Sequence, residues 1–89
     1  MIVAGEEKRR RYRESGWWGD QTFADLFAAN AAAHPERLAL VDAPNRGDFA
    51  FGQPQRLTYA ELAAEIDRIA GALVRAGIGK DDVLLVQLP

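Results

Sequence analysis

The chain contains no cysteine and only one histidine among its 89 residues. Without cysteine it can form neither disulfides nor thiolate-based catalytic or zinc sites, and a cytoplasmic setting is favoured. The single histidine, His34, stands beside Pro35, where a histidine usually interacts with the last carbonyls of a helix. Because no second histidine lies near it, we expect His34 to serve neither a metal site nor catalysis.

Long apolar runs and a strong charge are also missing. No run approaches the roughly 20 apolar residues of a membrane-spanning helix, and Met1-Ile2-Val3-Ala4 is too short for the core of a signal peptide. A formal net charge of −2 gives no reason to expect a nucleic acid as partner. The hydrophobic fraction of 48% is ordinary for a globular chain. We therefore expect a soluble, cytoplasmic protein of at most one small domain.

Residues 1–21 are predicted to form an N-terminal arm. The segment from Glu6 to Glu14 contains five basic and three acidic side chains. This basic cluster can indicate a nucleic-acid or localisation patch, but we favour a solvated helix because the rest of the chain is acidic. Trp17 and Trp18 follow between two glycines. Since the large indole ring often anchors a segment on a neighbouring surface, we expect the arm to dock on the body of its own protein rather than to stack on a ligand.

Two helices are predicted in residues 22–89. Thr22 can cap the first one together with Asp25. An alanine-rich run follows, and His34-Pro35 ends the helix. The second helix has its cap at Thr58, with Glu61 completing the capping box, and Gly77 is expected at its end.

The second helix has a distinct apolar side. Its apolar stripe, expected to face a core, consists of Leu62, Ile66, Ile69 and Leu73. Glu65 and Arg68 lie three residues apart on the exposed side and can form an ion pair.

The strand pattern predicts an incomplete sheet. Leu38–Val41 is an apolar strand, and the loop of residues 42–55 can hold a weak returning strand at Phe49 and Phe51. Val83–Leu88 is a second apolar strand, of the kind that needs neighbours on both sides. We predict an α/β segment of two main helices and two or three strands, and interpret it as the opening part of a larger protein.

No motif in the chain assembles a catalytic, cofactor-binding or metal-binding site. A Walker loop at Gly79-Lys80 would need glycine at Val74 and a hydroxyl residue at Asp81. A dinucleotide fingerprint at Gly77-Ile78-Gly79 would need glycine at Asp82 and a preceding strand. Nothing combines a nucleophile, a general base and an oxyanion site. We therefore assign no site residue of any kind, and expect the chain by itself to be inactive.

A series of short motifs runs from about Tyr12 to Pro89 in a specific order and spacing. It begins with the arm Arg11-Tyr12-Arg13-Glu14-Ser15-Gly16-Trp17-Trp18, followed by Thr22-Phe23-Ala24-Asp25-Leu26 and His34-Pro35-Glu36-Arg37-Leu38-Ala39-Leu40-Val41-Asp42. It continues with Leu57-Thr58-Tyr59-Ala60-Glu61-Leu62, Asp67-Arg68-Ile69-Ala70-Gly71-Ala72-Leu73 and Gly77-Ile78 to Val86-Gln87-Leu88-Pro89. In this series the chain resembles the start of AMP-forming acyl-CoA synthetases, the adenylate-forming enzymes. The arm and the ending look most like the members that activate aryl or alicyclic acids, such as cyclohexanecarboxylate-CoA ligases and dihydroxybenzoate-AMP ligases.

The resemblance implies a two-step reaction for the parent protein, which would belong to fatty-acid or aromatic-acid metabolism. ATP and a small carboxylic acid give an acyl-adenylate and pyrophosphate, and coenzyme A then displaces AMP, with Mg²⁺ as the metal. In that family the phosphate loop, the adenine and magnesium contacts, the acyl pocket and the catalytic lysine lie beyond the matched segment. Residues 22–89 would thus form the first α/β portion of the large N-terminal domain, with the remainder of the polypeptide as partner. One departure is Asp81, where the family usually has glycine before the aspartate that Asp82 matches; this leaves the turn conformation open.

Other interpretations remain. The adenylation domain of a peptide synthetase shares the Thr-Tyr-x-Glu-Leu helix start. A small stand-alone interaction module could dock through Trp17 and Trp18. Exposed apolar strand edges could also lead to self-association.

Overall fold

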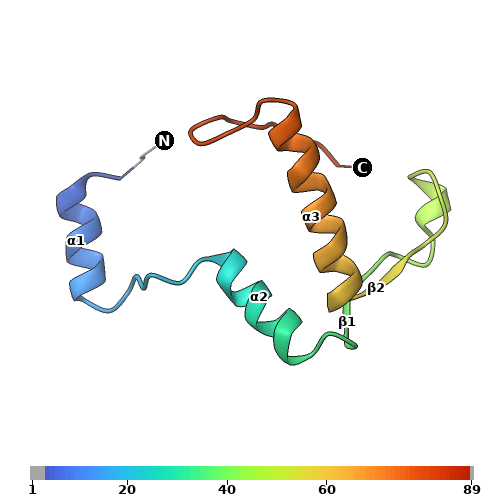
Figure 1. The fold of residues 1–89 in the computed structure, drawn as a ribbon, viewed down its shortest axis with the longest axis horizontal. Helices are drawn as coiled ribbons and strands as arrows, with labels where there is room; N and C mark the ends of the chain where they lie inside the picture. The colour runs from blue at the N-terminus through green and yellow to red at the C-terminus, as the bar shows by residue number, and fades with distance from the viewer. Residues whose placement is uncertain (1–3, 89) are drawn as a thin grey trace.

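The computed structural model describes residues 4–88, which form three helices and a two-stranded sheet (Figure 1). In chain order these are α1 (Glu6–Glu14), α2 (Phe23–Ala33), β1 (Leu38–Val41), a short 3₁₀ turn (Arg46–Asp48), β2 (Arg56–Thr58) and α3 (Tyr59–Arg75). The predicted α/β segment with an incomplete sheet is confirmed. Residues 1–3, which belong to the run Met1–Ala4 that is too short for a signal-peptide core, and Pro89 lie outside the described residues.

Both predicted capping boxes are present. The Thr22 hydroxyl accepts from the Asp25 N–H at 3.1 Å, and the Asp25 carboxylate accepts from the Thr22 N–H at 2.9 Å. Thr58 and Glu61 repeat this exchange at the start of α3, at 3.2 and 3.0 Å. Each box satisfies backbone groups that a helix start leaves without partners, so these threonines determine where α2 and α3 begin.

The helix ends also follow the local sequence. The His34 N–H closes α2 on the carbonyl of Asn30 at 2.8 Å. Gly77 has φ of 86° just beyond α3, and its N–H donates to Val74 O at 3.0 Å. The Ile78 N–H donates to Leu73 O, also at 3.0 Å. These two bonds form a Schellman motif, which needs a residue that tolerates positive φ at the Gly77 position.

The strand that returns to β1 is not the one predicted at Phe49 and Phe51. β1 pairs antiparallel with Arg56–Thr58, with Leu40 opposite Leu57, while Phe49 and Phe51 lie in the intervening loop. The Asp42 carboxylate closes this loop by accepting from the Gln55 N–H at 3.0 Å and pairing with Arg46 at 3.2 Å. Arg46 in turn donates to the carbonyl of Phe51 at 2.9 Å. The polar groups of the loop thus bond to one another, and the chain pairs with β1 only after the loop has ended, at Arg56–Thr58.

The predicted strand at Val83–Leu88 is also wrong for this structure. Residues 82–88 have no regular secondary structure, and the sheet of the described chain has the order β1-β2 only. A strand is defined by the neighbour to which it hydrogen bonds, and residues 4–88 supply none for this segment. Leu85 is accordingly 96% exposed.

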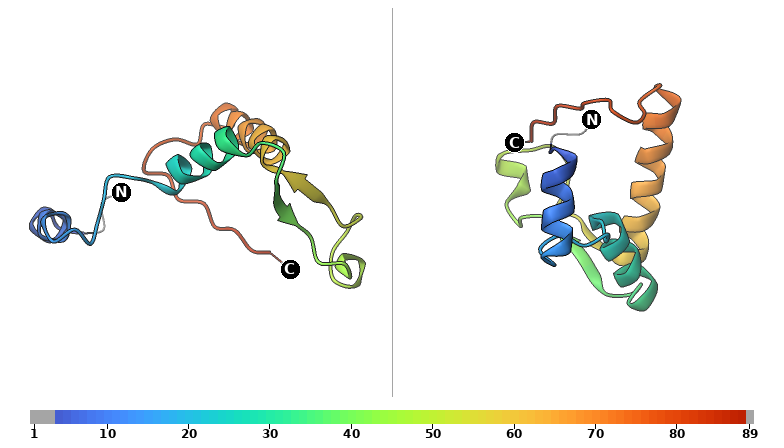
Figure 2. Two further views of the ribbon diagram at one scale, coloured as in Figure 1. Left: turned by 90° about the horizontal axis from the view of Figure 1, so that it is seen from below. Right: turned by 90° about the vertical axis from the view of Figure 1, so that its left-hand side faces the viewer.

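Helix α3 packs against the rest of the chain at its N-terminal end. The Tyr59 N–H donates to Arg37 O at 2.9 Å and the Ala60 N–H donates to Pro35 O at 3.0 Å. The rings of Phe27 on α2 and Tyr59 lie 5.8 Å apart. Figure 2 shows α2 meeting α3 near the N-terminal end of α3 and the hairpin projecting from this junction; its left view shows α1 apart from these elements.

No described residue is fully buried, so the predicted core is not formed within residues 4–88. The apolar stripe of α3 is only partly covered, with Ile66 and Ile69 exposed by 43% and 47%. The accessible surface is 7929 Å², against about 5200 Å² for a compact protein of this mass. The radius of gyration of 17.3 Å likewise exceeds the roughly 12 Å of a compact chain of this length.

Candidate functional site

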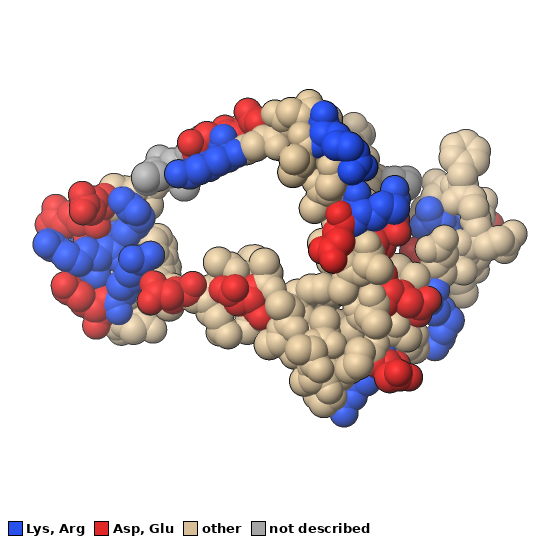
Figure 3. Space-filling model, in the orientation of Figure 1, with Lys and Arg blue, Asp and Glu red and all other residues tan. Residues whose placement is uncertain are grey.

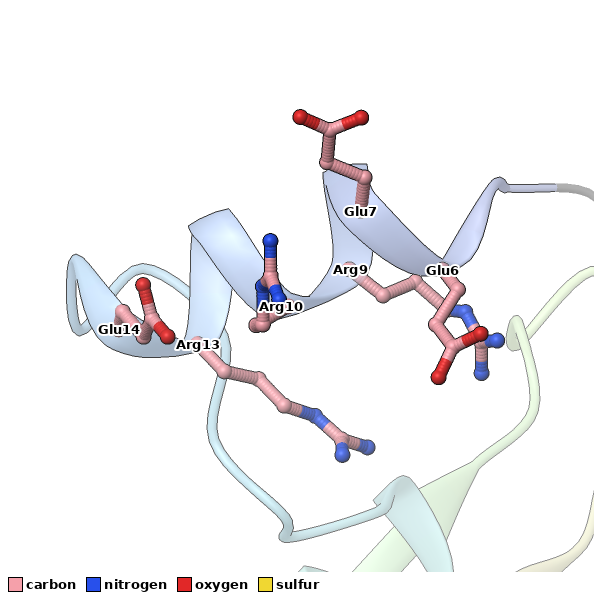
Figure 4. A pocket seen from close by; sticks show the side chains of 6 residues that line it. All are labelled: Glu6, Glu7, Arg9, Arg10, Arg13 and Glu14. Atoms are coloured by element: carbon pink, nitrogen blue, oxygen red, sulfur yellow. The ribbon is translucent and has the colours of Figure 1, made fainter.

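A hollow of the described surface lies along α1 (Figure 4). It measures about 700 Å³ and is lined by Glu6, Glu7, Arg9, Arg10, Arg13 and Glu14. All six side chains come from one helix of 9 residues, and Figure 4 shows them spreading from it in different directions. Because no second element forms a wall, the hollow is an open charged surface that cannot enclose a ligand.

The end of α1 carries an aromatic cluster made of Tyr12, Trp17 and Trp18. The Tyr12 ring lies 5.4 Å from that of Trp17 and 4.9 Å from that of Trp18. The Tyr12 carbonyl accepts the N–H groups of both tryptophans, at 3.0 and 3.1 Å. Lys8 and Arg11 lie over the Tyr12 ring, at 5.7 and 5.4 Å from its centroid. Trp17 nevertheless remains 73% exposed, so the cluster offers an uncovered indole surface.

The turn after α3 contains Asp81 and Asp82, the first of which departs from the pattern of the resembling family. The Gly79 N–H donates to the Asp82 carboxylate at 2.6 Å, and the Asp82 N–H donates to Gly79 O at 3.2 Å. Asp81 has φ of 70°, in the left-handed region that favours glycine. Asp81 stands where the resembling family usually has glycine, and it takes a glycine-like conformation there. Aspartate is one of the few residues that tolerate this conformation.

The carboxylates with shifted pKa values have structural roles. Hydrogen bonds, first from the backbone of Thr58 and then from its hydroxyl, lower the pKa of Glu61, and Thr22 lowers the pKa of Asp25 in the same way. The pKa of Glu65 is lowered by its hydrogen bond from Arg68, and that of Arg68 is raised in return. The predicted Glu65–Arg68 pair is thus confirmed, with Arg68 Nε donating to Glu65 Oε1 at 3.0 Å. None of these groups lines a cleft, so their shifts indicate capping and pairing rather than catalysis.

The described residues do not fit the groups that the resemblance implies for a full enzyme. No cluster of three or more histidine or acidic residues that could hold a metal ion occurs within residues 4–88. The hollow of α1 has no apolar wall on which an adenine ring could stack. No described helix is long and apolar enough to cross a membrane.

The sequence that forms α3, the hairpin and most of α2 matches a known family. The AMP-binding enzyme family matches residues 27–89, and the chain belongs to this family. Together with the incomplete sheet, this makes the chain a segment of an AMP-binding domain.

Individual relatives match nearly the whole chain. It is 41% identical over 80 residues to pyochelin synthase PchD of Pseudomonas aeruginosa, covering 90% of this chain and 13% of the relative. It is 36% identical to the salicyl-AMP ligase / salicyl-S-ArCP synthetase of Mycobacterium tuberculosis, covering 93% of this chain and 14% of the relative. The medium-chain fatty-acid–CoA ligase of Escherichia coli is 33% identical, with 99% of this chain and 14% of the relative covered. The chain therefore spans only about an eighth of these proteins, and no solved structure matches it.

Proposed function

We propose that the chain is the N-terminal segment of an ATP-dependent, AMP-forming carboxylate-CoA ligase. Residues 1–21 would form an arm that carries the basic cluster and the tryptophan pair, and residues 22–89 the first α/β portion of the large domain. The parent would join ATP and a carboxylic acid into an acyl-adenylate, releasing pyrophosphate, and would then transfer the acyl group to coenzyme A. ATP, Mg²⁺ and coenzyme A would bind to the remainder of the parent polypeptide.

The observation that carries this proposal is the uncovered apolar surface. No described side chain is buried, yet large apolar residues line α2, α3, β1 and the segment after Gly79. In relatives about seven times as long, most of the polypeptide lies outside the matched segment. Burying such surfaces is the main favourable term in folding. The segment's contribution would accordingly be structural: it supplies a helix layer and strands against which the remainder of the domain packs.

A second candidate differs in the group that accepts the acyl chain. Relatives at 36% and 31% identity are named as AMP ligases of salicylate and of 2,3-dihydroxybenzoate, and the first also as a salicyl-S-ArCP synthetase. These names favour an aryl-acid substrate and a protein-bound thiol in place of coenzyme A. This candidate is close to the adenylation domain of a peptide synthetase that the sequence left as an alternative. It shares the formation of the acyl-adenylate with the carboxylate-CoA ligase.

Carboxylate-dependent exchange of pyrophosphate into ATP tests the structural role. The purified 89-residue chain should give no exchange with salicylate, 2,3-dihydroxybenzoate, cyclohexanecarboxylate or octanoate, under conditions where the Bacillus subtilis 2,3-dihydroxybenzoate-AMP ligase is active with its own acid. Exchange by the purified chain would overturn the assignment of a purely structural role.

The source DNA beyond the codon for Pro89 tests the parentage. A frame that continues into a Ser/Thr/Gly-rich phosphate loop would support the ligase assignment. The complete product could then be assayed with coenzyme A and with a carrier protein to separate the two candidates. A stop codon directly after Pro89 would contradict the proposal and favour a stand-alone interaction module.

A further inference from the structure

The aromatic cluster of Tyr12, Trp17 and Trp18 is held in place by its own segment but is not covered. The Tyr12 carbonyl accepts the backbone N–H groups of both tryptophans, and their rings lie 5.4 and 4.9 Å from the Tyr12 ring. Gly16 takes φ of 77° in the turn between them. Trp17 and Trp18 are nevertheless 73% and 41% exposed. A surface that is ordered in advance loses little conformational entropy on binding, so the cluster is preorganised for docking.

The rest of the described chain does not cover this cluster. No Cα of α1 lies within 8 Å of a Cα in another described helix or strand. Figure 3 shows charged side chains around α1 and an open space between this part of the molecule and the body. The Arg13–Asp20 ion pair in the connection spans 3.7 Å, and both of its side chains are mostly exposed. Because exposed pairs of this kind contribute about 1 kcal/mol or less, this pair holds the orientation of α1 only weakly.

The relatives indicate that the cover belongs to the same polypeptide. The match to PchD takes 80 of the 89 residues, so it must include residues 10–80 and with them both tryptophans. The 88-residue match to the medium-chain fatty-acid–CoA ligase includes them as well. The cluster therefore lies in the stretch shared with these longer enzymes, although the family model begins only at residue 27. A tethered partner also has an effective concentration on the order of millimolar, which favours it over a separate molecule.

We propose that the aromatic cluster docks into an apolar pocket on the remainder of the parent polypeptide, with Trp17 as its anchor. A buried indole N–H usually finds an acceptor, so this pocket should offer a carbonyl or carboxylate oxygen. Lys8 and Arg11, which lie over the Tyr12 ring, would reach the rim of the pocket. The inference rests on the proposed function, because the remainder of the ligase is the partner. It gives residues 1–21 the role of holding the first α/β portion against that remainder.

Limited digestion with trypsin tests the docking, because α1 carries five basic residues between Lys8 and Arg13. The complete protein encoded by the continuing frame is compared with the 89-residue chain, and the released peptides are measured by mass spectrometry. Cleavage within α1 should be slower by about tenfold or more in the complete protein, since the protease must wait for the docked segment to open. This protection should not depend on protein concentration. Equal cleavage rates overturn the proposal, and so does protection that grows with concentration, because a second copy would then be the cover.

Matched variants of the complete protein test the anchor. Trp17→Ala should speed cleavage within α1 by about tenfold or more, the usual effect of truncating an anchoring aromatic residue. Phe51→Ala is the control, because Phe51 is 96% exposed but lies in the loop between β1 and β2. It should leave the protection unchanged. If the two variants are cleaved at the same rate, whether fast or slow, Trp17 is not the anchor and the proposal is overturned.

Carboxylate-dependent exchange of pyrophosphate into ATP, measured on the same complete protein, separates this inference from the proposed function. Exchange together with rapid cleavage of α1 overturns the docking and leaves the ligase assignment standing. Protection of α1 without exchange, with any of the four acids named above, supports the docking and contradicts the ligase assignment. A stop codon directly after Pro89 removes the partner and overturns both.

Discussion

At the residue scale, the best-determined positions are the two threonines that begin α2 and α3. Each exchanges two hydrogen bonds with an acid three residues on, and these bonds lower the pKa of Asp25 and Glu61. The sequence predicted both pairs because a capping box needs only four consecutive residues. The conformation of Asp81 could not be predicted from the sequence, because a positive φ at aspartate depends on how the turn around it closes.

Acidification should loosen the starts of α2 and α3. The ordinary pKa values are 3.8 for Asp25 and 4.5 for Glu61, and both are lower in the folded chain. The unfolded chain therefore binds more protons in this range, so the caps stabilise the helices fully above the ordinary values and lose this effect as the pH falls through the lowered ones. Amide chemical shifts of Thr22 and Thr58 followed in an acid titration measure the change. Glu61→Gln, whose amide oxygen still accepts a hydrogen bond, should remove the dependence at Thr58 but not at Thr22; an unchanged dependence at Thr58 would assign it to another group.

At the element scale, α3 shows how far local sequence can specify a helix. Its cap, its Glu65–Arg68 pair and its Schellman end all lie within contacts of three to five residues, and all three were predictable. The strand that pairs with β1 could not be predicted, because it depends on how the side chains of the 14-residue loop between Val41 and Arg56 bond to one another. Phe49 and Phe51 alternate as strand residues do, but the loop that contains them closes through Asp42 and Arg46.

Two glycine substitutions in and beyond α3 should have opposite effects. Gly77→Ala should weaken the end of α3 by about 1–2 kcal/mol, because alanine at φ of 86° meets backbone strain although nothing lies within 4 Å of its Cβ. Gly71→Ala should strengthen the helix by roughly 0.5–1 kcal/mol, since alanine loses less backbone entropy. Its Cβ meets only the flexible end of Arg75, at 3.3 Å. Thermal melting of the helical circular dichroism measures both changes, and a loss of helix in Gly71→Ala would contradict this account.

At the scale of the whole molecule, the decisive feature is that no side chain of residues 4–88 is buried. A chain with helices but no core has little to make its unfolding cooperative. Ile66 and Ile69 of its apolar stripe and the segment Val83–Leu88 are exposed, although their sequences are typical of buried elements. The family membership accounts for this pattern, because the chain spans only a small part of its relatives.

The isolated chain should therefore bind a hydrophobic dye and lose its helices gradually on heating. Both effects follow from exposed apolar surface without a packed interior. They are measured by dye fluorescence and by circular dichroism at concentrations where sedimentation shows a monomer. A sharp melting transition of the monomer without dye binding would mean that the chain forms a core of its own.

The sequence alone determined the helix starts and ends, the Glu65–Arg68 pair and the family resemblance. These features depend on residues within one or two helical turns of each other, or on motif order along the chain. Only the tertiary structure decided that β2 is Arg56–Thr58, that Val83–Leu88 forms no strand and that the apolar stripe of α3 has no core to face. Strand pairing and burial require partners distant in sequence, and residues 4–88 supply a strand partner for β1 but none for Val83–Leu88.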